Sequence, residues 1–122
     1  MKNRPNIIVV MPAYNAEKTL AKTVKDFPPN LVTKTILVDD GSSDGTVVLA
    51  KKLGLSVFTH PNNLGYGGNQ KTCYWEALKE NPDVVVMVHP DYQYDSSLTG
   101  ELVRPILEGR YEMMFGNRIR TR

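Results

Sequence analysis

The sequence has a single cysteine, Cys73, and no long apolar run. One cysteine excludes an internal disulfide and a cysteine zinc cluster, and it suits a reducing compartment. The apolar run at the amino-terminal end, Ile7 to Met11, spans five residues. That is shorter than the core of a signal peptide or a membrane span, so we expect a cytoplasmic protein.

The sequence also lacks a strong excess of charge. Its formal net charge is +2, and its basic residues are scattered except for the terminal group Arg118, Arg120 and Arg122. Electrostatics therefore gives no case for a nucleic-acid partner. A chain of 122 residues that is 41% hydrophobic and 23% charged is typical of one globular domain, and we expect residues 1–122 to form a single domain.

Short apolar runs alternate with stretches of helical periodicity along the chain. The runs predict strands at 7–11, 35–38, 56–59, 83–88 and 113–115. Helices are expected over 16–26, from Ser43 or Asp44 to Leu53, over 69–80, and around Leu98, Leu102 and Ile106. Continuous apolar strands with helices between them predict an α/β fold with a Rossmann-like, doubly wound and mainly parallel sheet.

Polar clusters follow the carboxyl ends of four predicted strands. They cover residues 12–17, 39–44, 60–69 and 89–95. Ligands of open α/β sheets bind outside those strand ends. The four clusters are therefore expected to converge on one edge of the sheet.

The glycine-rich segment, residues 63–69, has two open interpretations. Gly65 and Gly67 form a Gly-x-Gly pair, but Gln70 stands where a dinucleotide fingerprint has its third glycine, and no Gly-Lys-Ser/Thr follows as in a P-loop. Either the segment needs positive φ values before a helix, or its backbone N–H groups at the helix start hold an anion or a ribose.

Two groups of acidic residues stand out. Of Asp39, Asp40 and Asp44, we expect Asp40 to contact a ligand and Asp44 to cap the following helix. His89 and Asp91 lie two residues apart, so in an extended segment both could reach one divalent cation, with Asp91 the better ligand for a hard cation. Alternatively, His89 is a hydrogen-bonded residue at a strand end.

Support for a nucleophilic mechanism is weak. No serine lies in a Gly-x-Ser-x-Gly elbow, and Cys73 falls within a predicted helix. We interpret Cys73, Tyr74 and Trp75 as packing residues.

Taken together, the clusters resemble the inverting family 2 glycosyltransferases of the GT-A fold. The resemblance is carried by Ile7-Ile-Val-Val-Met-Pro-Ala-Tyr-Asn15, Ile36-Leu-Val-Asp-Asp-Gly-Ser-Ser-Asp-Gly-Thr46, Asn63-Leu-Gly-Tyr-Gly67, Val86-Met-Val-His-Pro-Asp-Tyr-Gln93 and Gly116-Asn-Arg118. The segment around Asp91 and Gln93 and the final Gly-Asn-Arg are most similar to the dolichyl- or polyprenyl-phosphate sugar synthases.

This resemblance implies a nucleotide-sugar donor and a site for it. The positions that match the family's base and ribose contacts are Pro12, Tyr14, Val38 and Asp40, with Glu17 one residue beyond the family's usual glutamate position. The family's Asp-x-Asp element falls on His89-Pro90-Asp91. It implies a Mg²⁺ or Mn²⁺ ion held by Asp91 and His89, Gln93 beside it and Arg118 on a phosphate.

The resemblance further implies inverting transfer of a sugar, with polyprenyl phosphate as acceptor, at the cytoplasmic face of a membrane and in cell-envelope glycan synthesis. No catalytic base is assigned, because acceptor-side residues of such enzymes follow the segment seen here. We therefore expect the donor-binding portion of the enzyme. Three alternatives are a non-catalytic nucleotide-sugar-binding module, a transferase to a saccharide acceptor, and a different nucleotide-binding α/β enzyme.

Overall fold

The computed structural model describes residues 5–28, 30–90, 113–115 and 118–120. They form one sheet with the strand order β3-β2-β1-β4-β5-β6. The strands are β1 (Ile7–Ala13), β2 (Lys34–Asp39), β3 (Ser56–Thr59), β4 (Val84–Met87), β5 (Met113–Phe115) and β6 (Arg118–Arg120). Strands β1 to β5 pair in parallel and β6 pairs antiparallel to β5, which confirms the predicted α/β fold with a mainly parallel sheet.

Strand β1 is the centre of the sheet, and its sequence explains why. All seven of its residues are buried, and it pairs with β2 on one side and β4 on the other. A strand covered on both faces reads as a continuous apolar run rather than an alternating one, as Ile7 to Met11 does.

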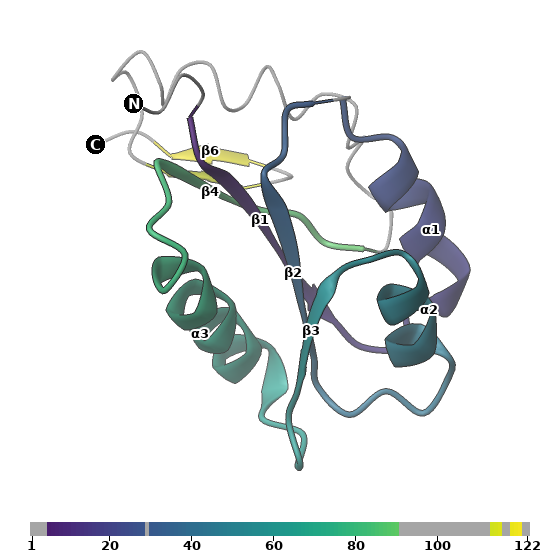
Figure 1. Ribbon diagram of the computed structural model, residues 1–122. Helices are drawn as coiled ribbons and strands as arrows, with labels where there is room; N and C mark the ends of the chain where they lie inside the picture. The colour runs from purple at the N-terminus through teal and green to yellow at the C-terminus, as the bar shows by residue number, and fades with distance from the viewer. Residues whose placement is uncertain (1–4, 29, 91–112, 116–117, 121–122) are drawn as a thin grey trace.

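Helices cover both faces of the sheet, as Figure 1 shows. Helices α1 (Glu17–Lys25) and α2 (Thr46–Lys52) lie on one face, where Leu20 and Ala50 pack into a core cluster with Val9 and Leu37 of the sheet. Helix α3 (Gly65–Leu78) lies on the other face, where Cys73 and Ala77 pack against residues of β1 and β2. This arrangement is the doubly wound one that the sequence predicts.

Three details differ from the sequence predictions. Helix α3 begins at Gly65 rather than near Asn69, and the antiparallel strand β6 was not expected. Cys73 is fully buried, as expected for a packing residue, whereas Trp75 is 66% exposed, so its assignment to packing was wrong. The helix expected around Leu98, Leu102 and Ile106 lies outside the described residues.

Helix α2 begins differently from the expectation as well. Its N-cap residue is Gly45, one position after Asp44, and Gly54 follows its end with the positive φ expected of a glycine at that position. None of the helices in the described part of the chain is long and apolar enough to cross a membrane.

Candidate functional site

The carboxyl ends of β1, β2 and β4 surround two adjoining hollows. The larger has a volume of about 600 Å³, and its wall includes Glu17, Asp44 and His89. The smaller has a volume of about 250 Å³, and its wall includes Asp40, Asn63 and Asn69. Three residues line both: Pro12, Tyr14 and Tyr66. The predicted convergence of the polar clusters on one edge is confirmed for the residues that the structure describes, and residues 91–95 of the fourth cluster lie outside them.

The loop after β1 and the loop after β2 are joined by reciprocal hydrogen bonds. The N–H of Asn15 donates to Ser42 Oγ at 2.7 Å, and the N–H of Ser43 donates back to Asn15 Oδ1 at 2.8 Å. The buried N–H of Ala16 donates to Thr46 Oγ1 at 2.9 Å. These bonds fix the two loops that form one wall of the larger hollow.

Glu17 and Asp44 exchange contacts at the starts of helices α1 and α2. Asp44 Oδ2 accepts the N–H of Glu17 at 3.2 Å, and Glu17 Oε1 accepts the N–H of Gly45 at 3.0 Å. Asp44 Oδ1 also accepts the N–H of Thr46 at 3.0 Å, so Asp44 satisfies helix-start donors as predicted, but from one residue before the N-cap. The pKa of Asp44 is lowered, and the largest cause is the hydrogen bond that its carboxylate accepts from the Thr46 hydroxyl.

The adjacent aspartates Asp39 and Asp40 serve different loops. Asp39 Oδ2 accepts the N–H groups of Gly41 at 3.0 Å and Ser42 at 2.8 Å, so its carboxylate shapes the turn that follows β2. Gly41 has a φ of +91°, a conformation that glycine adopts at little cost. Asp39 is therefore a structural residue of this turn.

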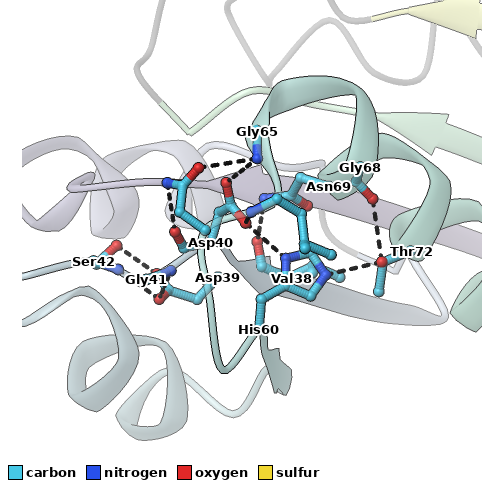
Figure 2. Close-up of polar contacts among 12 residues, drawn as sticks. Val38, Asp39, Asp40, Gly41, Ser42, His60, Gly65, Gly68, Asn69 and Thr72 are labelled. Carbon is cyan, nitrogen blue, oxygen red and sulfur yellow. Dashed lines mark hydrogen bonds and ion pairs between the residues drawn. The ribbon is translucent and has the colours of Figure 1, made fainter.

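Asp40 is bound by groups from two other segments (Figure 2). Its Oδ1 lies 2.7 Å from His60 Nδ1 and accepts the N–H of Leu64 at 2.8 Å. Its Oδ2 accepts the N–H of Gly65 at 2.9 Å, and its carbonyl accepts from the Asn63 side chain at 3.0 Å. The start of α3 thus donates the N–H groups of Leu64 and Gly65 to a carboxylate of this same chain, and a part of the glycine-rich segment in holding an anion or a ribose stays a prediction. Gly65 alone of its glycines has a positive φ, +80°.

Its hydrogen bonds keep the Asp40 carboxylate ionised, although Asp40 is only 4% exposed. Burial acts to raise the pKa of Asp40, but the bonds from Leu64, His60 and Gly65 outweigh it, so the pKa lies below the ordinary value of 3.8. A carboxylate that only accepts hydrogen bonds therefore stands at the wall of the smaller hollow.

The lowered pKa of Asp40 predicts an acid-sensitive fold. A group with a depressed pKa in the folded state adds stability above its unfolded pKa, here near 3.8, and that stability is lost as the pH falls through the lower folded value. We expect the free energy of unfolding in urea to decline below about pH 4. The decline should be shallower in Asp40→Asn, and an equally steep decline in both proteins would contradict this origin.

His89 and Tyr66 contact each other at the wall of the larger hollow. The Tyr66 hydroxyl lies 3.0 Å from His89 Nε2, and the two rings stack with centroids 5.6 Å apart. The next residue, Pro90, is buried, and its carbonyl accepts a hydrogen bond from the Thr19 hydroxyl of α1. The end of β4 is thus held by α1 on one side and by the first turn of α3 on the other.

The structure brings together six of the residues predicted for the site. Pro12, Tyr14, Glu17, His89 and Pro90 line the larger hollow, and Asp40 lines the smaller one. Val38 is fully buried, and its carbonyl accepts from the Asn69 side chain at 2.9 Å. Asp91 and Gln93 lie outside the described residues, and Arg118 is described only as the first residue of β6.

Four residues in or next to the walls of the hollows were not predicted from the sequence: His60, Tyr66, Asn69 and Thr72. All but Thr72 lie within a polar cluster that the sequence places at a strand end, and that is the signal that could have found them. Their partners are distant in sequence, so nothing local identifies the contacts. One example is the Asn69 side chain, which reaches Val38 across 31 positions.

His89 and Asp91 are the two residues predicted to hold a divalent cation. Within the described residues, no three His, Cys, Asp or Glu side chains gather as a metal site. His89 lines the hollow, and Asp91 follows two positions later in the sequence. Because Asp91 lies outside the described residues, a cation held by His89 and Asp91 stays a prediction.

Comparison with known proteins gives consistent matches over most of the chain. The model of the family described as "Glycosyl transferase family 2" matches residues 8–122. The chain is 35% identical over 117 residues to an uncharacterized protein of Methanocaldococcus jannaschii, covering 96% of this chain and 48% of that protein. It is 27% identical over 132 residues to UDP-N-acetylglucosamine–dolichyl-phosphate N-acetylglucosaminyltransferase of Methanococcus voltae, covering 94% and 53%.

A solved structure shares the fold. Glucosyl-3-phosphoglycerate synthase from Mycobacterium tuberculosis, in complex with Mn²⁺, UDP and glucosyl-3-phosphoglycerate, matches with a TM-score of 0.68 at 28% identity. The match covers 84% of this chain and 40% of that one. The chain therefore spans about half the length of the two curated relatives and less of the crystallised enzyme.

Proposed function

The chain belongs to glycosyl transferase family 2, and from this premise we propose that it holds the nucleotide-sugar donor in a metal-assisted, inverting sugar transfer. The observation that carries the proposal is the ionised Asp40 at the wall of a small hollow that opens beside a larger one. In this proposal the base occupies the smaller hollow, and the ribose, the diphosphate and the transferred sugar occupy the larger.

The smaller hollow suits a nucleobase that offers a ring N–H. Asp40 only accepts hydrogen bonds, so it complements a donor such as the N3–H of uracil. The rings of Tyr14 and Tyr66 line the hollow and are 57% and 58% exposed, which leaves apolar surface for a base to pack against. UDP is also the nucleotide named for the similar crystallised enzyme. We therefore propose a uridine nucleotide.

The larger hollow suits the diphosphate and the sugar. Asp91 and His89 would hold the cation, Gln93 would lie beside it, and Arg118 would pair with a phosphate. A bound cation neutralises the charge that develops on the departing diphosphate. The chain's own part is to orient the donor between the loops that Asn15, Ser42 and Ser43 tie together.

For the acceptor we propose polyprenyl phosphate. The support is the name of the Methanococcus voltae relative, which transfers to dolichyl phosphate. An ionised phosphate oxygen can attack the anomeric carbon without a strong base, which suits a site with no assigned catalytic base. A lipid acceptor would place the working protein at the cytoplasmic face of a membrane. A soluble acceptor is the second candidate, because the similar crystallised enzyme has been captured with phosphoglyceric acid.

Titration calorimetry with a panel of nucleoside diphosphates tests the proposed donor. We expect UDP to bind in the presence of Mn²⁺ and more weakly in EDTA, with ADP and CDP weaker than UDP. A folded sample that binds none of the panel would overturn the proposal. Incubating the full-length protein with radiolabelled UDP-sugar and polyprenyl phosphate, or with phosphoglyceric acid, then decides between the lipid and soluble acceptors.

A further inference from the structure

His60 is a nearly buried histidine that the donor site described above does not use. It follows β3 directly, and its backbone N–H donates to the Asp39 carbonyl at 2.9 Å. Its side chain is 9% exposed and lies between the carboxylate of Asp40 and the hydroxyl of Thr72 on α3 (Figure 2). Through this ring, the ends of β2 and β3 and the second turn of α3 are connected.

The other hydrogen-bond partners of Asp40 determine which atom donates in its contact with His60. The Asp40 carboxylate accepts backbone N–H groups from Leu64 and Gly65 and is ionised, so it offers acceptors only. His60 Nδ1, 2.7 Å from Oδ1, must therefore carry the proton and donate it. On the far side of the ring, Nε2 lies 2.9 Å from Thr72 Oγ1, and the single proton of that hydroxyl is shared between Nε2 and the Gly68 carbonyl at 3.2 Å.

These contacts determine how the Asp40 carboxylate is turned. The terminal torsion of an aspartate side chain is soft, so its hydrogen bonds decide its orientation. Oδ1 is saturated by His60 and Leu64, whereas Oδ2 accepts one hydrogen bond from the described part of the chain, that of the Gly65 N–H. With Oδ1 held in this way, Oδ2 is the oxygen that retains capacity for a further donor.

We propose that His60 is a positioning residue for donor recognition, which fixes the Asp40 carboxylate so that one oxygen stays available to the N–H of the base. This inference rests on the proposed function of the smaller hollow. His60 itself does not line that hollow, so it acts through Asp40. Thr72 in turn holds the far nitrogen of the ring.

A matched pair of substitutions separates the two sides of the ring. The amide nitrogen of asparagine stands where His60 Nδ1 stands, so His60→Asn keeps a donor for Asp40. The longer glutamine in His60→Gln places its amide where Nε2 stands, so it keeps the contact with Thr72 and loses the one with Asp40. A role in filling space would favour the larger glutamine, whereas a role through Asp40 favours asparagine.

The experiment measures UDP affinity by calorimetry for the wild type and both variants, after thermal unfolding has shown that each is folded. We expect His60→Gln to lose about tenfold in affinity, the equivalent of one hydrogen bond to a charged group. His60→Asn should stay within about threefold of the wild type. Wild-type affinity in His60→Gln, or an equal loss in both variants, would overturn the positioning role.

A second readout does not depend on any ligand. The amide protons of Leu64 and Gly65 report the orientation of the carboxylate that they bind, so their NMR shifts and exchange protection should change in His60→Gln and persist in His60→Asn. If the wild type binds no nucleotide, the proposed function fails while these amides still test the positioning of Asp40. If the amides are unchanged in His60→Gln, the inference fails whatever UDP does.

Discussion

Replacing Asp40 with asparagine is expected to weaken UDP binding by on the order of 10- to 100-fold, the range of one hydrogen bond to a charged group. The asparagine amide has an N–H₂ group in place of one carboxylate oxygen. This N–H₂ group must face a donor on either side, namely the base, His60, or the N–H groups of Leu64 and Gly65. Each of these partners is a donor toward Asp40. Calorimetry at neutral pH gives the affinity directly.

The same substitution should also lower stability. The Asp40 side chain is 6% exposed and accepts hydrogen bonds from His60, Leu64 and Gly65, and leaving such a buried donor without its acceptor costs about 2 kcal/mol. Asp26→Asn is the matched control, because the Asp26 carboxylate pairs with Lys22 on the surface of α1. It should change the free energy of unfolding by less than about 0.5 kcal/mol and leave UDP affinity unchanged. If Asp40→Asn behaves like Asp26→Asn, the assignment of Asp40 is wrong.

The second large effect is expected from Asp91→Ala. Asp91 is the carboxylate proposed to hold the cation against the diphosphate, so the variant should lose the gain in UDP affinity that Mn²⁺ gives to the wild type. We expect the ratio of affinities in Mn²⁺ and in EDTA to fall to about one, since a cation at a diphosphate is worth several kcal/mol. Affinity in EDTA should stay near that of the wild type.

Glu76→Gln serves as the control for Asp91→Ala. Glu76 is a partly buried residue of α3 that pairs with the exposed Lys79, and it lines neither hollow. Its Mn²⁺-to-EDTA ratio should match the wild type. A wild-type ratio in Asp91→Ala would remove Asp91 from the metal site and leave His89 as the candidate.

The sheet could be predicted because each strand carries its own signal. A parallel strand buried on both faces must be apolar throughout, and Ile7 to Met11 and Val84 to Met87 meet that demand without reference to the rest of the chain. The convergence of the polar clusters follows from the same parallel order. The start of α3 could not be predicted, because Gly65, Gly67 and Gly68 disfavour helix by propensity, and tertiary contacts at Asp40 hold the first turn instead.

The place of a residue at the sheet edge could be predicted where it follows directly from the end of a strand, as for Asp40 and His89, whose roles toward a ligand stay predictions. It was missed where the role is set by a distant partner. His60 is connected to Asp40 across 20 positions and to Thr72 across 12, and no periodicity reports such a contact. Trp75 shows the opposite failure, because a large apolar side chain suggests a core and yet this one is mostly exposed.

The most direct test of nucleotide binding in the smaller hollow is a titration of the ¹⁵N-labelled chain with UDP, without Mn²⁺, followed by NMR. We expect the largest shift changes at the amides of Ala13, Asp40, Gly65 and Asn69, which line the smaller hollow. A third cleft, of about 560 Å³, lies at the opposite edge of the sheet and is lined in part by Asn6, Thr33 and Asn81. Shift changes at the cleft on that opposite edge would contradict binding in the smaller hollow. The absence of any shift change in a folded sample at millimolar UDP would contradict it as well.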